Sequence, residues 1–98
     1  MAKGYWIAFV TVSDPEAYAG YQSLAPEAFA KYGARFLVRG GDATPLEGED
    51  WQRHVIIEFE SKAQALACYN SPEYQAARSH RSGACTANIV IVDGMPVT

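Results

Sequence analysis

The sequence predicts a single α+β domain with the element order βαββαβ, in which both helical regions cover one face of a four-stranded antiparallel sheet. Three observations predict it. Four short segments are rich in β-branched and aromatic residues, which favour strands. Two longer segments between them have helical spacing and begin with helix-start signals. The chain has 98 residues, which suits one domain.

The first strand is predicted over residues 5–12, an aromatic and β-branched run that ends at a turn signal. A helix follows, because Asp14 can accept from free backbone N–H groups and Pro15 fits the first helical position. Apolar residues then recur along one stripe of this helix. Pro26 lies inside it, so we expect a kink or a break near Leu24.

The other three strands are predicted over residues 35–39, 54–59 and 87–93. A loop rich in Asp, Thr, Pro, Glu and Gly joins the first two of these. Right-handed crossovers place both helical regions on the same side of the sheet, which gives a ferredoxin-like arrangement.

The second helical region has two start signals, at Ser61 and at Ser71 followed by Pro72. It is therefore predicted to be bent and to end at about Ser82. The side chains expected to face the sheet from its first part are Ala63, Leu66 and Ala67, with Tyr69 as a further candidate.

The hairpin of the second and third strands predicts which side chains share the uncovered face. One set of alternate residues is wholly apolar and should meet the helices: Phe36, Val38, Val55, Ile57 and Phe59. The opposite face is then predicted to carry three facing pairs: Arg35 with Glu58, Leu37 with Ile56, and Arg39 with His54.

This second face is too apolar for bulk water and too charged for a dry core. A second copy of the chain covering it, with a partly wet cavity between the copies, solves the problem, and pairing of identical faces is common. The alternative is a monomer, since antiparallel sheets tolerate one face in water. We expect a homodimer.

Composition excludes several classes of function. The net charge is −3 and no run of Lys or Arg is present, so we expect no nucleic-acid partner. The apolar run near the N-terminus is too short to cross a bilayer, and a cytoplasmic protein without a membrane partner is expected. Cys68 and Cys85 have no metal-ligand spacing, and the two histidines lie in separate elements, so neither a metal nor another cofactor is expected.

Several segments resemble a bacterial family, domain-of-unknown-function family 1330. The most specific are Arg-Phe-Leu-Val-Arg-Gly-Gly at 35–41 and Tyr-Asn-Ser-Pro-Glu-Tyr at 69–74, and the resemblance covers about residues 4–94. It implies a dimeric α+β barrel and no established reaction. Related barrels include cofactor-free monooxygenases, isomerases, haem proteins and ligand-sensing modules, so the fold does not choose among them.

Charged side chains on the uncovered face are the main candidates for chemistry. Arg35 and Arg39 could hold a carboxylate or enolate in a bidentate manner, and Glu58 or His54 could move a proton. The alternative is that Arg35 and Glu58 form a structural ion pair at a dimer interface.

Three further residues are candidate ligand contacts: Trp6, Asn70 and Tyr74. Asn70 and Tyr74 lie at a predicted helix junction that could border a cavity, whereas aromatic residues at helical spacing more often pack in the core. Two functions remain open: a cofactor-independent enzyme acting on a small anionic or carbonyl-bearing metabolite, and a non-catalytic ligand-binding or accessory homodimer.

Overall fold

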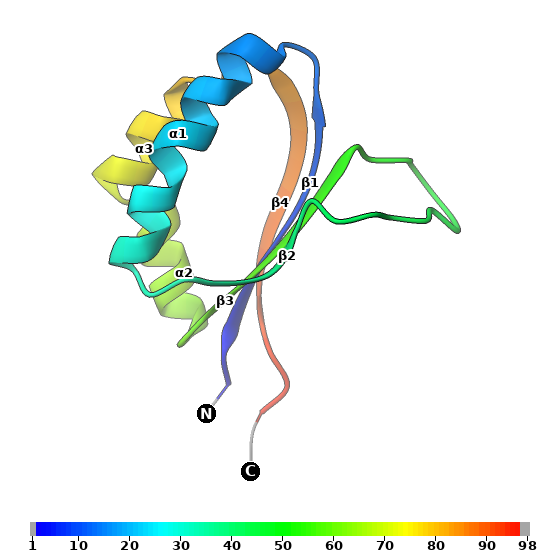
Figure 1. Cartoon of the computed structure of the whole chain (residues 1–98). Coiled ribbons are helices and arrows are strands. Elements are labelled where there is room, and N and C mark those ends of the chain that lie inside the picture. The colour runs from blue at the N-terminus through cyan, green and yellow to red at the C-terminus, as the bar shows by residue number, and fades with distance from the viewer. Residues whose placement is uncertain (1, 97–98) are drawn as a thin grey trace.

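A four-stranded sheet lies against a layer of helices in the computed structural model, which describes residues 2–96 (Figure 1). The strand order is β2-β3-β1-β4, and all neighbouring strands are antiparallel. The predicted ferredoxin-like fold class is therefore confirmed. In chain order the elements are β1 (Gly4–Val12), α1 (Pro15–Lys31), β2 (Arg35–Arg39), β3 (Arg53–Phe59), α2 (Lys62–Tyr69), α3 (Pro72–Ser79) and β4 (Cys85–Asp93).

Helix α1 begins where the sequence predicts, with the Asp14 carboxylate accepting from the Ala17 N–H at 3.2 Å. It runs through Pro26 without interruption, so the predicted break is wrong. The proline removes one helical hydrogen bond. Burial of Ala25 and Phe29 on either side of it holds the helix together, since tertiary packing supplies most helical stability.

The second helical region is divided into α2 and α3, and α3 ends at Ser79 rather than near Ser82. Helix α2 turns Ala65 and Cys68 to the sheet, so the predicted inward residues Ala63, Leu66 and Ala67 are wrong, whereas Tyr69 packs against the core as predicted. The two faces of this short helix have the same apolar spacing, and the one that contains Leu66 is turned away because β1 approaches closely: a Cβ at Gly4 would collide with the backbone of Ser61. Only small side chains fit in so narrow a space.

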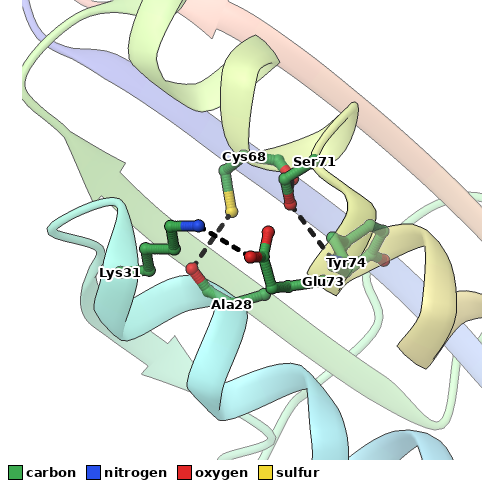
Figure 2. Close-up of polar contacts among 6 residues, drawn as sticks. All are labelled: Ala28, Lys31, Cys68, Ser71, Glu73 and Tyr74. Atoms are coloured by element: carbon green, nitrogen blue, oxygen red, sulfur yellow. Dashed lines mark hydrogen bonds and ion pairs between the residues drawn. The ribbon is translucent and has the colours of Figure 1, made fainter.

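Ser71 joins α2 to α3 and is 3% exposed. Its hydroxyl donates to the Cys68 carbonyl at 2.7 Å and accepts from the Tyr74 N–H at 3.1 Å (Figure 2). Beside it, Lys31 of α1 forms an ion pair with Glu73 of α3 at 2.6 Å. The hydrogen bond from Lys31 lowers the pKa of Glu73. This junction fixes α3 relative to both neighbouring helices.

Replacing Ser71 with alanine is expected to lower the free energy of unfolding by about 1.5–3 kcal/mol, because it removes both the cap on α3 and a buried hydrogen bond to the Cys68 carbonyl. Ser61 is the matched control, since its hydroxyl caps α2 through one hydrogen bond, from the Gln64 N–H at 3.0 Å. Ser61→Ala should cost about 1 kcal/mol. Urea denaturation measures both, and equal losses would contradict the role given to Ser71.

The core is centred on Trp6, which is 1% exposed. The rings of Tyr74, Phe29 and Tyr69 lie with centroids 5.0, 5.1 and 5.6 Å from its own, and Phe59 stacks at 6.2 Å. Edge-to-face and tilted contacts at these distances are favourable beyond the area they bury.

A β-bulge changes the predicted register between β2 and β3. Arg35 faces Glu58 as predicted, but Val38 faces Ile56 and Arg39 faces Val55. The predicted pairs of Leu37 with Ile56 and of Arg39 with His54 are therefore wrong, as is the predicted inward orientation of Val38. Leu37 is an extra residue in β2, and a bulge of this kind re-aims the side chains that follow it. The bulge thus turns Arg39 from the uncovered face to the helix side.

Candidate functional site

A cavity lies between α1 and the sheet. Helix α1 packs mainly against α3, whereas α2 packs against β1, β3 and β4, so α1 stands away from the strands. The cavity in this gap has a volume of about 90 Å³, and one buried water needs only about 10–15 Å³. It therefore has room for a small organic molecule.

The inner wall of the cavity is apolar and aromatic. Trp6, Phe29 and Ile57 line it and are each at most 5% exposed. Phe36 from β2 lies on the same wall, with its ring centroid 5.4 Å from that of Phe29. A wall of this kind favours a flat, apolar molecular body.

Three arginines line the same cavity: Arg39 at the end of β2, Arg53 at the start of β3 and Arg81 between α3 and β4. The strand register brings Arg39 and Arg53 to the same end of the sheet, because Arg39 faces Val55 and Arg53 lies two residues before Val55 on β3. Among the described residues that line the cavity, none is Asp, Glu or His. The cavity therefore carries an excess of positive charge in a protein whose net charge is −3.

Carboxylates do not neutralise these arginines. Within residues 2–96 the ion pairs join Lys3 to Glu60 and Lys31 to Glu73. Arg53 keeps a buried Nε without any hydrogen-bond partner in that part of the chain. A buried cationic donor without a hydrogen-bond partner is energetically costly. An anion that enters the cavity could pair with Arg53 without first breaking an ion pair within the protein.

Arg81 is held by phenol groups. Its guanidinium donates to the Tyr74 hydroxyl at 3.3 Å and lies 5.1 Å from the ring centroid of Tyr21. The Tyr21 and Tyr74 hydroxyls are 3.0 Å apart. Burial raises the pKa of Tyr21 well above its ordinary value, and it also raises that of Tyr18 on the same helix. The two tyrosines that line the cavity therefore stay neutral.

Gly40 allows the β2–β3 hairpin to close over Arg53. Its φ of +69° is in the left-handed region, and a Cβ there would lie 3.2 Å from Arg53 Nη2. Arg39, which follows the bulge, lies with its guanidinium carbon 4.4 Å from the ring centroid of Phe36. The turn at Gly40 thus positions the guanidinium of Arg53, and the bulge in β2 positions that of Arg39.

The predicted site residues fall into separate regions. Trp6 and Arg39 line the cavity. Tyr74 is fully buried behind Tyr21, and Asn70 is an exposed residue at the end of α2, so neither borders the cavity. The idea that Arg39 shares the uncovered face with the other charged candidates is wrong, and the bulge is the reason.

The remaining candidates do lie on the uncovered face of the sheet. Arg35 and Glu58 are opposite one another in the register but form no ion pair in the described chain. Glu58 instead accepts from the Tyr5 hydroxyl at 2.9 Å, and this hydrogen bond raises the pKa of Tyr5. His54 packs its ring against Phe9, with centroids 5.5 Å apart.

Sequence reasoning missed Arg53 and Arg81. Arg53 had a usable signal, since it precedes Val55 and Ile57 by two and four residues, and alternate residues of a strand share a face. Arg81 lies in a turn after α3, where no periodicity predicts the direction of a side chain.

Over residues 2–96, no three His, Cys, Asp or Glu side chains converge as metal ligands would. None of the helices in the described chain has the length and apolar character needed to cross a bilayer.

The fold and its cavity define the chain as a ferredoxin-like α+β protein with a cationic pocket between sheet and helices. The chain belongs to the family described as "Domain of unknown function (DUF1330)", whose model matches residues 3–95. The resemblance identified from the sequence is therefore confirmed. None of the curated proteins matches the chain.

Three solved structures illustrate the similarity. A protein of unknown function from Rhodopseudomonas palustris, RPA0582, has a TM-score of 0.78 and 22% identity, over 99% of this chain and 84% of that one. SnoaB, a cofactor-independent oxygenase from Streptomyces nogalater, has a TM-score of 0.62 and 11% identity, over 99% and 97%. A protein of unknown function from Bacteroides fragilis, described as dimeric with a ferredoxin-like fold, has a TM-score of 0.57 and 17% identity, over 93% and 95%. At these identities the likeness extends to the fold alone.

Proposed function

We propose that this protein binds a small organic anion in the cavity between α1 and the sheet. The observation that supports this most directly is the group of Arg39, Arg53 and Arg81, which line the cavity without an ion-pair partner in residues 2–96. A guanidinium presents two parallel N–H groups that match a carboxylate or an enolate. The apolar wall beside them favours an anion with a flat body, such as an aromatic acid.

A panel of matched ligands tests the proposal. Benzoate, phenylacetate and pyruvate would each be compared with the corresponding neutral amide in a thermal-unfolding assay. At least one anion at about ten times its Kd should raise the Tm by about 5 °C or more, while its amide leaves the Tm unchanged. Equal effects of anion and amide, or no effect of any anion, would refute the proposed site.

Cofactor-independent catalysis on the bound anion is a second candidate function. The similarity of fold to SnoaB, which is described as a cofactor-independent oxygenase, favours it. Guanidinium groups aimed at a developing negative charge stabilise anionic transition states. Turnover of an anion that the panel identifies, followed under air and under nitrogen, would distinguish an oxygenase from a binding protein.

We also propose that two copies of the chain pair through the uncovered face of the sheet. Large apolar side chains are exposed on this face, with Val90 53%, Val92 43% and Val38 37% exposed. Two similar structures are described as dimeric ferredoxin-like proteins, which supports the same arrangement. Removing this apolar area from water is the driving force.

Replacing Val90 with glutamate is expected to abolish the dimer, because it places a charge at the centre of the proposed interface opposite Ile7. Leu24→Glu is the matched control, since Leu24 is 38% exposed on α1, in the helix layer. Light scattering after size exclusion should give twice 10.7 kDa for the wild type and for the control. A wild-type protein of 10.7 kDa at micromolar concentration would contradict the proposed dimer.

A further inference from the structure

The cavity concentrates positive charge but contains no group that could accept a proton at neutral pH. Every titratable side chain that lines it within residues 2–96 is an arginine or a tyrosine: Arg39, Arg53, Arg81, Tyr18 and Tyr21. The arginines are permanently charged. The tyrosines are neutral because burial opposes their ionisation.

An acid placed beside these guanidiniums is favoured in its ionised form. A single opposite charge within about 4–6 Å lowers the pKa of a neighbouring acid by roughly 1–3 units, and here three guanidiniums line one small cavity. Burial among Trp6, Phe29 and Ile57 opposes this ionisation, as it does for Tyr21. The Tyr21 hydroxyl pairs with the Tyr74 hydroxyl, however, whereas a ligand oxygen that accepts directly from the guanidiniums gains charge-assisted hydrogen bonds that favour its anion. The effect is largest for an acid that is still protonated in solution at neutral pH.

We propose that the cavity takes weakly acidic phenols or enols and binds them as their conjugate bases. The inference rests on the proposed anion-binding function and names the ligand class. On binding, the O–H bond breaks, the oxygen keeps the electron pair beside the guanidiniums, and the proton passes to solvent. Arg39 and Gln22 line the cavity and are exposed, so they mark its opening to water.

Ionisation makes the bound ligand more reactive as a nucleophile. A phenolate or enolate is much richer in electrons than its parent acid, so the protein activates the ligand without supplying a base of its own. The aromatic wall that includes Trp6 and Phe36 suits the planar body of such a ligand.

4-Nitrophenol is a direct probe, because its anion absorbs visible light and its neutral acid does not. The dye would be titrated with pH in excess protein, and its midpoint compared with that of the free dye. Binding should lower the midpoint by about one pH unit or more. Arg53→Met and Arg39→Met should each reduce this shift, and Arg39 is exposed, so its variant is expected to fold. Arg35→Met, on the opposite face, should leave the shift unchanged.

Benzoate, which is ionised throughout this pH range, separates the two proposals. If benzoate binds and the dye binds with an unchanged or raised midpoint, the cavity does not ionise its ligand and this inference fails, while the anion site stands. If neither benzoate nor the dye binds, both proposals fail. A lowered midpoint that Arg35→Met removes and Arg53→Met preserves would also overturn the inference, because it would place the dye on the other face.

Discussion

Replacing Trp6 with alanine is expected to lower the free energy of unfolding by about 3–5 kcal/mol, the usual cost of deleting a buried aromatic side chain. Trp6 contacts rings from α1, β3 and the α2–α3 region, so its removal leaves a cavity bordered by three elements. Small domains have only about 5–15 kcal/mol of stability in total. The variant should therefore be partly or wholly unfolded at 37 °C, and urea denaturation at 25 °C measures the loss.

Trp51 is the matched control. It is half-buried, and Phe9 is its one aromatic neighbour in the described chain, with the ring centroids 6.3 Å apart. Trp51→Ala should cost about 1 kcal/mol. Similar losses for the two tryptophans would contradict the assignment of Trp6 to the centre of the core.

Replacing Arg53 with methionine is expected to weaken binding of benzoate by about 10- to 100-fold. Methionine keeps much of the length and apolar stem of the side chain but removes the charge. Hydrogen bonds to charged groups contribute roughly 1.5–3 kcal/mol, which corresponds to this range. Isothermal titration calorimetry measures the change in Kd.

Arg35→Met controls for the loss of one positive charge from the protein. Arg35 is exposed on the opposite face of the sheet, and its replacement should change the Kd less than twofold at physiological ionic strength, because distant charges are screened. If Arg35→Met weakened binding as much as Arg53→Met, the anion would be bound outside the α1 cavity.

Most of the fold could be predicted because local signals and hydrophobic pattern agree along the chain. Asp14 and Ser71 cap the helices that their sequence positions predict. The strands begin and end within two residues of the expected positions. The break predicted at Pro26 was wrong, because packing of α1 against α3 keeps the helix continuous there. Such packing cannot be read from one segment of the sequence.

The candidate site could be predicted only in part, and β2 shows why. Leu37 and Val38 are both apolar, so the pattern fits either register, and nothing in it indicates that one residue is extra. A shift of one residue moves each following side chain to the other face. Arg39 was therefore recognised as a ligand-binding candidate but placed on the wrong side of the sheet, away from Arg53 and Arg81.

The central claim is that an organic anion contacts the guanidiniums inside the α1 cavity. Arginine Nε–Hε signals in a nitrogen–proton NMR spectrum report this contact residue by residue during a titration with benzoate. The signals of Arg53 and Arg81 should move together and saturate at one Kd, while those of Arg35 and Arg78 stay in place. Movement of the Arg35 signal while the Arg53 signal stays fixed would contradict the claim.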